Sequence, residues 1–372
     1  MLDVTTPGEQ DSSIEVLPTS TPVPAEDRRS LMADPAFGSV FTDHMATIRW
    51  NGERGWHNAQ VRARAPFPID PACSVLHYAQ EIFEGLKAYR QADDRIALFR
   101  PAQNARRFAD SARRMAMPPV PEELFLAAIK ALVATDCDWV PHGEGSLYLR
   151  PFMFSSEAFL GVRPSNEYTF CVIACPVGNY FKGGVKPLNL WLSEEHSRAA
   201  PGGTGAAKCG GNYAAGLLAQ AEAQQNGCDQ VVFLDAVEHR WIEELGGMNL
   251  FFVMNDNSIV TPQLGGTILP GITRSSIITL ARDCGLSVEE RRYAITEWRN
   301  DAASGRLIEA FACGTAAVVA GIGSARSASF ELTVADRQTG RLTKALRDEL
   351  IGMQLGHIPD RHGWIDIVDL TA

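Results

Sequence analysis

The order of predicted strands and helices is the feature of this sequence that most restricts its fold. The two kinds of segment follow one another without strict alternation. Buried strands are predicted at "SLYLRPFMF" and "EYTFCVIACPVG", and the apolar spacing of "PAQNARRFADSARRMAM" predicts a helix that begins at Pro101. A doubly wound sheet would need strands and helices to alternate regularly. We therefore predict an α/β fold of the mixed α+β kind.

A break in this pattern divides the chain. The stretch "GNYFKGGVKP" has two adjacent glycines and a proline, as interdomain connections often do. With 372 residues, 45% of them hydrophobic, the chain can bury two cores. We expect a flexible N-terminal arm over 1–35, a smaller α/β domain over 36–177, an interdomain loop over 178–187 and a larger C-terminal domain over 188–372.

The composition disfavours several kinds of partner. A net charge of −10 repels nucleic acid, and no apolar run is long enough to span a bilayer. The first residues lack the basic start and apolar core of a secretory signal. The eight cysteines form no C-x-x-C pair and no N-x-[ST] sequon occurs, so we expect free thiols, a cytoplasmic location and no metal site.

One lysine stands alone in a glycine-rich stretch, "PGGTGAAKCGGNYAAGLL", where Lys208 is the only charge between Arg198 and Glu222. A solvated surface lysine is one interpretation. A phosphate-cradling lysine is a second, although Ala207 and Cys209 replace the glycine and hydroxyl of that motif. A nucleophile that forms a Schiff base is the third, because burial lowers a lysine pKa from its usual value of ~10.4. Composition fits the third interpretation without establishing it.

Further stretches share the order and spacing of one enzyme family. They are "FGSVFTDHM", "LHYAQEIFEGLKAYR", "LFRPAQNARRFADSARRM", "SLYLRPFMF", "CPVGNYF", "KCGGNYAAGLL", "EELGGMNLFFV", "GTILPGITRSSI" and "EAFACGTAAVV". The chain thereby resembles the branched-chain amino acid aminotransferases, which are fold-type IV pyridoxal-phosphate enzymes. The resemblance runs from about Phe37 to about Trp364.

The resemblance implies pyridoxal 5′-phosphate as cofactor, bound in the C-terminal domain. Lys208 would be the catalytic residue, linked to the cofactor as an aldimine and then released to carry a proton. Glu244 would hold the proton of the ring nitrogen, and Tyr213 would bond the phenolic oxygen. "LPGITRSS" would supply N–H groups to the phosphate at a helix N-terminus. The remaining cofactor contacts that the resemblance implies are Arg107, Arg198, Ile272, Thr273 and Thr315.

The resemblance also implies a substrate site. The substrate carboxylate would meet the backbone N–H groups of Thr315 and Ala316 and the hydroxyl of Tyr78, which Tyr148 and Arg150 support. The apolar pocket would be lined by Phe37, Phe83 and Tyr180, with Leu160 and Val162 from a partner subunit. Each buried methylene is worth roughly 0.8 kcal/mol, so the pocket would favour branched side chains. Arg150 and the tyrosine hydroxyls both remain candidates for the γ-carboxylate of glutamate.

The activity that the resemblance implies is ping-pong amino transfer between L-leucine, L-isoleucine or L-valine and 2-oxoglutarate, by a homodimer. This reaction would be the last step of branched-chain biosynthesis or the first step of breakdown. D-amino acid aminotransferases and aminodeoxychorismate lyases share the lysine and the glutamate, and are the nearest alternatives. A nucleotide-binding module that uses "GGTGAAK" is a distant alternative, and a catalytically inactive relative is another.

Overall fold

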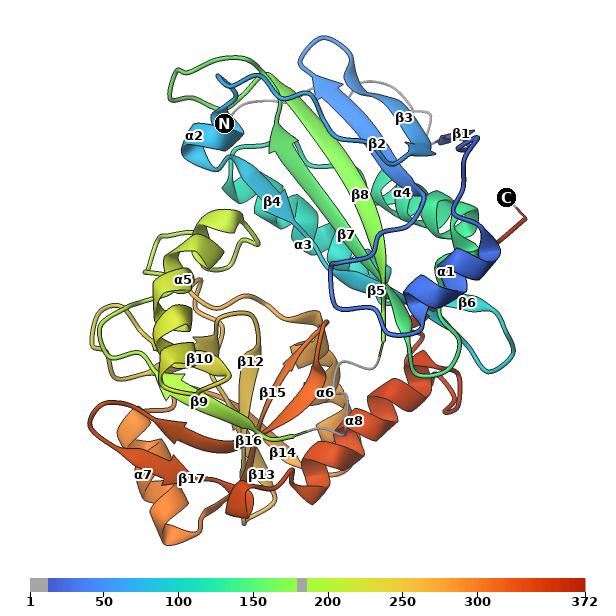
Figure 1. Cartoon of the computed structure of the whole chain (residues 1–372). Helices are drawn as coiled ribbons and strands as arrows, with labels where there is room; N and C mark the ends of the chain where they lie inside the picture. The colour runs from blue at the N-terminus through green and yellow to red at the C-terminus, as the bar shows by residue number, and fades with distance from the viewer. Residues whose placement is uncertain (1–12, 179–185, 372) are drawn as a thin grey trace. The chain divides into compact units, whose positions relative to one another are not determined.

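The computed structural model describes residues 13–178 and 186–371 and divides them into two compact units (Figure 1). The first unit runs to Gly178 and takes up the chain again from Gln354, and the second ends at Met353. The mixed α/β fold that the sequence predicts is confirmed, with one sheet in each unit.

The C-terminal stretch departs from the expected division, which placed all of 188–372 in one domain. Strand β18 (Ile365–Ile367) pairs antiparallel with β6 (Ile96–Phe99), which would otherwise be the edge strand of the first sheet. Backbone groups left unpaired at that edge are thereby satisfied. The last residues therefore belong to the first unit.

The first unit is built on a nine-stranded sheet within the described residues. Its order is β1-β3-β2-β8-β7-β5-β6-β18, and β4 pairs with β7. Its remaining strands are β1 (Glu15–Leu17), β2 (His44–Asn51), β3 (Gly55–Ala63), β4 (Glu81–Phe83), β5 (Leu86–Arg90), β7 (Ser146–Ser155) and β8 (Glu167–Val177).

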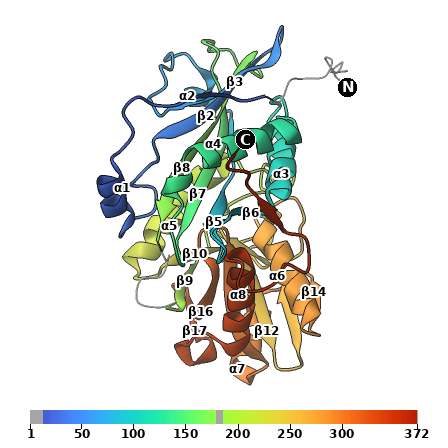
Figure 2. The same cartoon turned by 90° about the vertical axis from the view of Figure 1, so that its right-hand side faces the viewer.

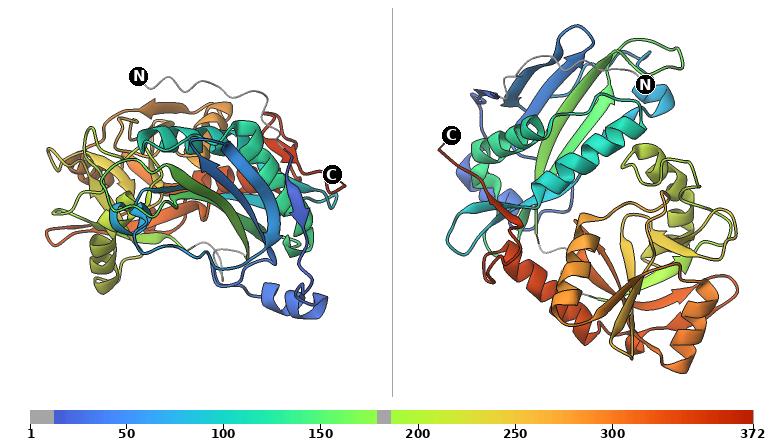
Figure 3. Two further views of the ribbon diagram at one scale, coloured as in Figure 1. Left: turned by 90° about the horizontal axis from the view of Figure 1, so that it is seen from above. Right: turned by 180° about the vertical axis from the view of Figure 1, so that it is seen from behind.

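Two helices cover one face of this sheet. They are α3 (Pro101–Arg114) and α4 (Glu122–Thr135), which lie side by side across the strands (Figure 3). The rings of Phe108, Phe125 and Phe170, the last from β8, contact one another with centroids 5.3–5.7 Å apart. These buried rings join helices and sheet into one core, because aromatic side chains bury the largest apolar areas. The short helix α2 (Ser74–Tyr78) precedes β4.

The N-terminal segment, expected as a flexible arm, has regular structure in its described part. Strand β1 pairs in parallel with β3, and α1 (Ala25–Met32) follows. The backbone N–H of Thr19 donates to Nε2 of His44 at 2.9 Å, and that of Val23 donates to Asp43 at 3.0 Å. Composition alone did not indicate these long-range hydrogen bonds. Residues 1–12 lie outside the described part.

The second unit also has a nine-stranded sheet among its described residues, in the order β11-β10-β9-β16-β15-β12-β13-β14, with β17 on β16. Its core is the apolar face built from residues such as Phe252, Tyr293 and Trp298. The strands are β9 (Leu188–Leu192), β10 (Gln230–Leu234), β11 (Ile242–Leu245), β12 (Asn249–Met254), β13 (Ser258–Thr261), β14 (Ser287–Glu290), β15 (Leu307–Gly314), β16 (Val318–Arg326) and β17 (Glu331–Thr333).

Helices of the second unit include α5 (Gly210–Gln225), α6 (Ile272–Asp283), α7 (Ile295–Ser304) and α8 (Arg341–Gln354). Helix α6 lies beside β14 and α7 beside β17, as Figure 2 shows. In the described part of the chain, no helix combines the length and apolar character that crossing a membrane requires.

Candidate active site

The lone lysine of the glycine-rich stretch lies two residues before the first residue of α5. Lys208 is partly buried, and its Nζ donates a 2.7 Å hydrogen bond to the hydroxyl of Tyr213 in the first turn of the helix. The same amine lies 5.1 Å from the centre of the Tyr213 ring. The structure therefore brings together two of the residues expected at the cofactor.

A buried asparagine holds the glycine-rich stretch against α5. The Nδ2 of Asn212 donates to the carbonyls of Thr204 and Ala207, both at 2.8 Å, and its Oδ1 accepts from the Thr204 hydroxyl at 2.7 Å. Gly205 passes so close to the backbone of Thr267 that an added Cβ would collide with the Thr267 carbonyl. Only glycine fits there, so Lys208 follows a tightly held turn.

Glu244 in β11 is almost fully buried and is held by several donors. Its Oε1 pairs with Nη1 of Arg198 at 2.9 Å and accepts the N–H of Leu269 at 2.9 Å. Its Oε2 accepts from Nδ2 of Asn249 at 3.2 Å. Burial raises the pKa of Glu244 to about 7, while the Arg198 guanidinium and, more weakly, the Lys208 amine act to lower it. A carboxyl with this pKa can hold or share a proton near neutral pH.

The neighbouring Glu243 has different partners. It is also buried and accepts a hydrogen bond from the hydroxyl of Thr267. Burial raises its pKa, and this hydrogen bond opposes the rise. Arg198 donates to the Thr267 carbonyl at 3.1 Å, so one buried cation lies near both glutamates.

Two turns of the second unit present backbone N–H groups. Ile272 and Thr273 open α6, whose N-cap is Gly271, so their N–H groups belong to the first turn of a helix. Thr315 and Ala316 lie in the turn between β15 and β16. That turn ends at Val318, a β-branched residue with φ 59° in the left-handed region. Such strain is often found at functional sites.

In the first unit, Arg107 of α3 is buried and forms a fork with Glu84. Its Nε donates to Oε1 at 2.7 Å and its Nη2 to Oε2 at 2.9 Å. Glu84 lies between β4 and β5 and has no exposed surface. This is the strongest kind of arginine–carboxylate contact, because it is bidentate and shielded from water.

The expected substrate residues of the first unit form an aromatic group around one arginine. Nη2 of Arg150 donates to the Tyr148 hydroxyl at 3.0 Å, and its guanidinium lies 4.8 Å from the centre of the Phe83 ring. The half-exposed ring of Phe37 packs edge-on against Tyr148 at 5.0 Å. Within the described residues, the buried Nε of Arg150 has no hydrogen-bond partner. The site thus contains an unused donor of the kind that binds carboxylates.

A second, more exposed group lies in the same unit. The Tyr78 hydroxyl donates to the carbonyl of Leu160 at 2.6 Å. Leu160 is 57% exposed and Val162 is 85% exposed, which is unusual for aliphatic side chains in one loop. Tyr180 lies outside the described residues.

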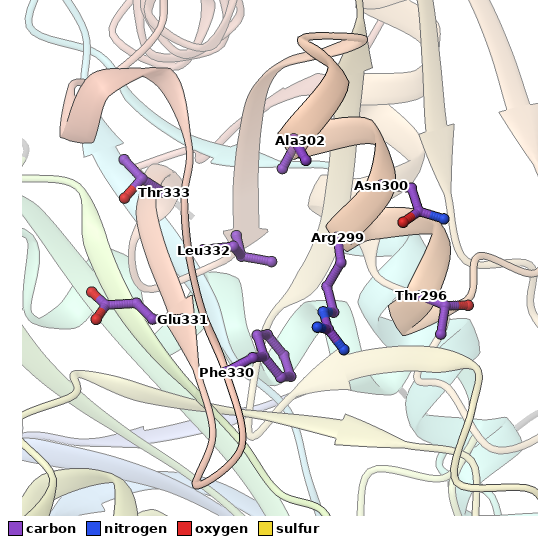
Figure 4. Close-up of a pocket in the computed structure, with 9 residues that line it drawn as sticks. Thr296, Arg299, Asn300, Ala302, Phe330, Glu331, Leu332 and Thr333 are labelled. Atoms are coloured by element: carbon purple, nitrogen blue, oxygen red, sulfur yellow. The ribbon is translucent and has the colours of Figure 1, made fainter.

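Figure 4 shows a groove of the second unit. It has a volume of about 610 Å³ and lies between α7 and the β17 region, where the Arg299 guanidinium stands 4.7 Å from the centre of the Phe330 ring. None of the expected site residues lines it. Among the described residues, no cluster of His, Cys, Asp and Glu could hold a metal ion.

Sequence reasoning missed the residues that support the expected ones. Glu84 lies in the quoted "FEGLKAYR", Asn212 in "KCGGNY" and Asn249 in "GGMNL". Their partners are 5 to 23 positions away, and the contacts depend on the fold. The only sequence signal for these supporting residues was a polar side chain within or next to a motif, since buried polar groups need hydrogen-bond partners.

Comparison with known proteins identifies the class of enzyme. The family described as "Amino-transferase class IV" matches residues 81–325. A "Probable branched-chain-amino-acid aminotransferase" of Streptomyces coelicolor is 54% identical over 355 residues, covering 95% of this chain and 98% of that protein. A "Branched-chain-amino-acid aminotransferase" of Mycolicibacterium smegmatis is 55% identical over 349 residues, covering 92% and 95%. The chain therefore belongs to the class IV aminotransferases.

Solved structures agree with this class. The branched-chain aminotransferase of Escherichia coli superposes with a TM-score of 0.73 at 27% identity, over 88% of this chain and 99% of that one. A second branched-chain aminotransferase, solved with pyridoxamine 5′-phosphate and named as that of T.th., gives 0.71 at 28% identity, over 87% and 99%. Within the class IV family, the chain belongs with the branched-chain-amino-acid aminotransferases of fold type IV, and pyridoxal 5′-phosphate is its cofactor.

The residues present fit this cofactor. A partly buried amine, a buried carboxyl with a pKa near neutral and a helix N-terminus that can receive an anion all lie in the second unit. The family assignment also favours the aminotransferase prediction over the nucleotide-binding alternative for "GGTGAAK".

Proposed function

We propose that the chain exchanges amino groups between L-leucine, L-isoleucine or L-valine and 2-oxoglutarate by a ping-pong mechanism. The hydrogen bond from Lys208 to Tyr213 is the observation on which this proposal mainly depends. The cofactor, when bound, supplies an aldehyde that links to amines and a ring that delocalises the electron pair left at the substrate Cα. The protein must hold that ring, move a proton and bind two kinds of side chain at one place.

Lys208 would hold the cofactor and then carry the proton between the substrate Cα and the cofactor. A primary amine suits both tasks once it is shielded from water. Tyr213, at 2.7 Å, keeps Nζ in place and would donate its hydroxyl proton to the phenolic oxygen of the cofactor.

Glu244 would keep a proton at the ring nitrogen. Its partner Arg198 stabilises the carboxylate, and its burial favours sharing of the proton with a nearby base. The N–H groups of Ile272 and Thr273, the Thr315 side chain and the guanidinium of Arg107 would bind the phosphate. Arg198 would then act near the ring rather than at the phosphate, because it pairs directly with Glu244.

Arg150 is our preferred partner for the γ-carboxylate of glutamate. Its Nε is buried without a hydrogen-bond partner among the described residues, and unsatisfied buried donors are costly until a ligand arrives. One solved relative is named as a complex with N-(5′-phosphopyridoxyl)-L-glutamate, which supports glutamate as the second substrate here. When leucine binds instead, the rings of Phe83 and Tyr148 would cover its apolar side chain.

The N–H groups of Thr315 and Ala316 would bind the α-carboxylate of either substrate, together with the Tyr78 hydroxyl. Leu160 and Val162 would enter the pocket of a second copy, so we propose a cytoplasmic homodimer. Their high exposure in one chain supports this arrangement. The reaction is reversible, and either biosynthesis or breakdown would use the same residues.

Borohydride reduction of the purified yellow protein, followed by peptide mapping, tests the proposal. We expect a pyridoxyl group on Lys208 and steady-state kinetics with L-leucine and 2-oxoglutarate that give parallel double-reciprocal plots. Lys208→Ala should abolish turnover and leave the melting temperature nearly unchanged. Preference for D-alanine or aminodeoxychorismate would favour the alternative fold-type IV activities, and labelling elsewhere would refute the role of Lys208.

A further inference from the structure

Glu84 is a fully buried carboxylate that the proposed roles do not use. Besides the fork with Arg107, it accepts from Nδ2 of Asn104 at 2.7 Å and from the N–H of Gly85 at 3.0 Å. Burying a carboxylate costs several kcal/mol unless donors replace its water. The Asn104 side chain and the Gly85 N–H therefore help Arg107 to stabilise the buried negative charge of Glu84.

The geometry of the fork determines how that arginine is oriented. Glu84 takes the edge that carries Nε and Nη2, at 2.7 and 2.9 Å. A guanidinium is planar and has five donor protons, so binding along this edge turns the end that carries Nη1 away from Glu84. An arginine held in this way keeps one rotamer, whereas an unsupported arginine would lose rotamer freedom when an anion binds.

We propose that Glu84 is a positioning residue, which fixes the guanidinium of Arg107 in the orientation that receives the cofactor phosphate. The inference rests on the proposed role of Arg107 at the phosphate. Asn104 assists by holding the same carboxylate and, at 3.3 Å, the carbonyl of Gly85. Contacts behind a binding group set how precisely that group is placed.

Binding of two ligands to the cofactor-free protein tests the inference. Pyridoxal 5′-phosphate has the phosphate and pyridoxal lacks it, so the ratio of their affinities isolates the phosphate contribution. We expect Glu84→Gln to weaken pyridoxal 5′-phosphate binding by about ten- to hundredfold and to leave pyridoxal binding unchanged. Arg107→Lys should have a similar effect, since a lysine cannot form the fork. The double variant should lose no more than Arg107→Lys alone.

Asp136→Asn is the matched control. Asp136 is a buried carboxylate of the same unit that pairs with Nδ1 of His44 at 2.6 Å. This variant should lower the melting temperature without changing the affinity ratio. Where Glu84→Gln does not fold, Glu84→Asp keeps the charge but withdraws it by about one carbon–carbon bond, and should also lower the ratio.

Three results would overturn the inference. They are an unchanged ratio in the Glu84 variants, an equal loss for both ligands, and additive losses in the double variant. If Arg107→Lys itself leaves the ratio unchanged, the phosphate role of Arg107 fails as well. If the affinity ratio falls in Arg107→Lys but not in the Glu84 variants, the positioning role of Glu84 is wrong and the phosphate role of Arg107 stands.

Discussion

At the scale of the residue, Glu244 gives the cofactor-free protein a distinctive pH dependence. Its pKa is raised from 4.5 to about 7 by burial, so the unfolded chain releases this proton at lower pH than the folded chain does. The stability contribution of the carboxyl is therefore complete below about pH 4.5 and is lost as the pH rises through 7. The loss amounts to about 3 kcal/mol, at about 1.4 kcal/mol for each pKa unit.

Glu244→Gln removes this titration. Below pH 7 the wild-type carboxyl is itself mostly protonated, and glutamine replaces it with another neutral group of similar size. The free energy of unfolding of the variant, relative to wild type, should therefore rise by about 3 kcal/mol between pH 4.5 and 8. Urea unfolding across this range measures it, with Glu53→Gln in the exposed β2–β3 turn as control. If the free energies of unfolding of wild type and Glu244→Gln differ by the same amount at every pH, the prediction is wrong.

Tyr213 offers a second test at this scale. Tyr213→Phe removes the hydroxyl that accepts the 2.7 Å bond from Lys208 and keeps the ring. Hydrogen bonds to charged groups are worth about 1.5–3 kcal/mol, so kcat/KM for L-leucine should fall about ten- to hundredfold. The melting temperature should change little, because the ring still packs. Steady-state rates within a factor of two of wild type would show that the hydroxyl has no role in turnover.

The functional residues within recognisable motifs could be predicted from the sequence, whereas the groups that hydrogen-bond to them could not. Lys208, Tyr213 and Glu244 were assigned from the resemblance, and the structure brings Lys208 to Tyr213 and close enough to Glu244 to act on its charge. The N–H of Leu269 reaches Glu244 across 25 positions of sequence. A hydrogen bond of that kind exists only once the chain has folded, so no local pattern announces it.

At the scale of the element, the link between β4 and β5 has almost no free space. A Cβ added to Gly85 would collide with the Tyr148 hydroxyl, so Gly85→Ala must displace that side chain. Misplacing a substrate-binding group by about 1 Å can cost a hundredfold, and we expect KM for L-leucine to rise at least about tenfold. The control is Gly52→Ala, where an added Cβ would meet no atom within 4 Å beyond the adjacent residues, so KM should not change. An unchanged KM in Gly85→Ala would show that the position of Tyr148 does not matter for substrate binding.

Long, strongly periodic elements were predictable, whereas short ones were missed. The helix that begins at Pro101 and the strand "SLYLRPFMF" appear as α3 and β7. Helix α7 was not predicted, since it has ten residues, a β-branched start and no side-chain cap. Strand β18 has three residues, and pairing with β6 defines it.

At the scale of the whole molecule, the exposed aliphatic side chains of Leu160 and Val162 predict self-association. Apolar side chains 57% and 85% exposed in one loop are typical of protein interfaces. We expect sedimentation equilibrium to give twice the chain mass for wild type. The double change Leu160→Asp and Val162→Asp should give monomers with reduced activity. Val237→Asp, which alters a 72% exposed side chain in a turn of the second unit, is the control. A monomeric wild type would refute the proposed homodimer.

The pairing of β18 with β6 has a consequence for synthesis on the ribosome. The N-terminal unit emerges first, but its sheet keeps an open edge at Ile96–Phe99 until residues 365–367 have been translated. The unit made later, which ends at Met353, has all its strands available before that moment. Domains generally fold as they emerge from the ribosome. The sheet of the unit that is synthesised second can therefore be complete before the sheet of the unit whose synthesis begins first.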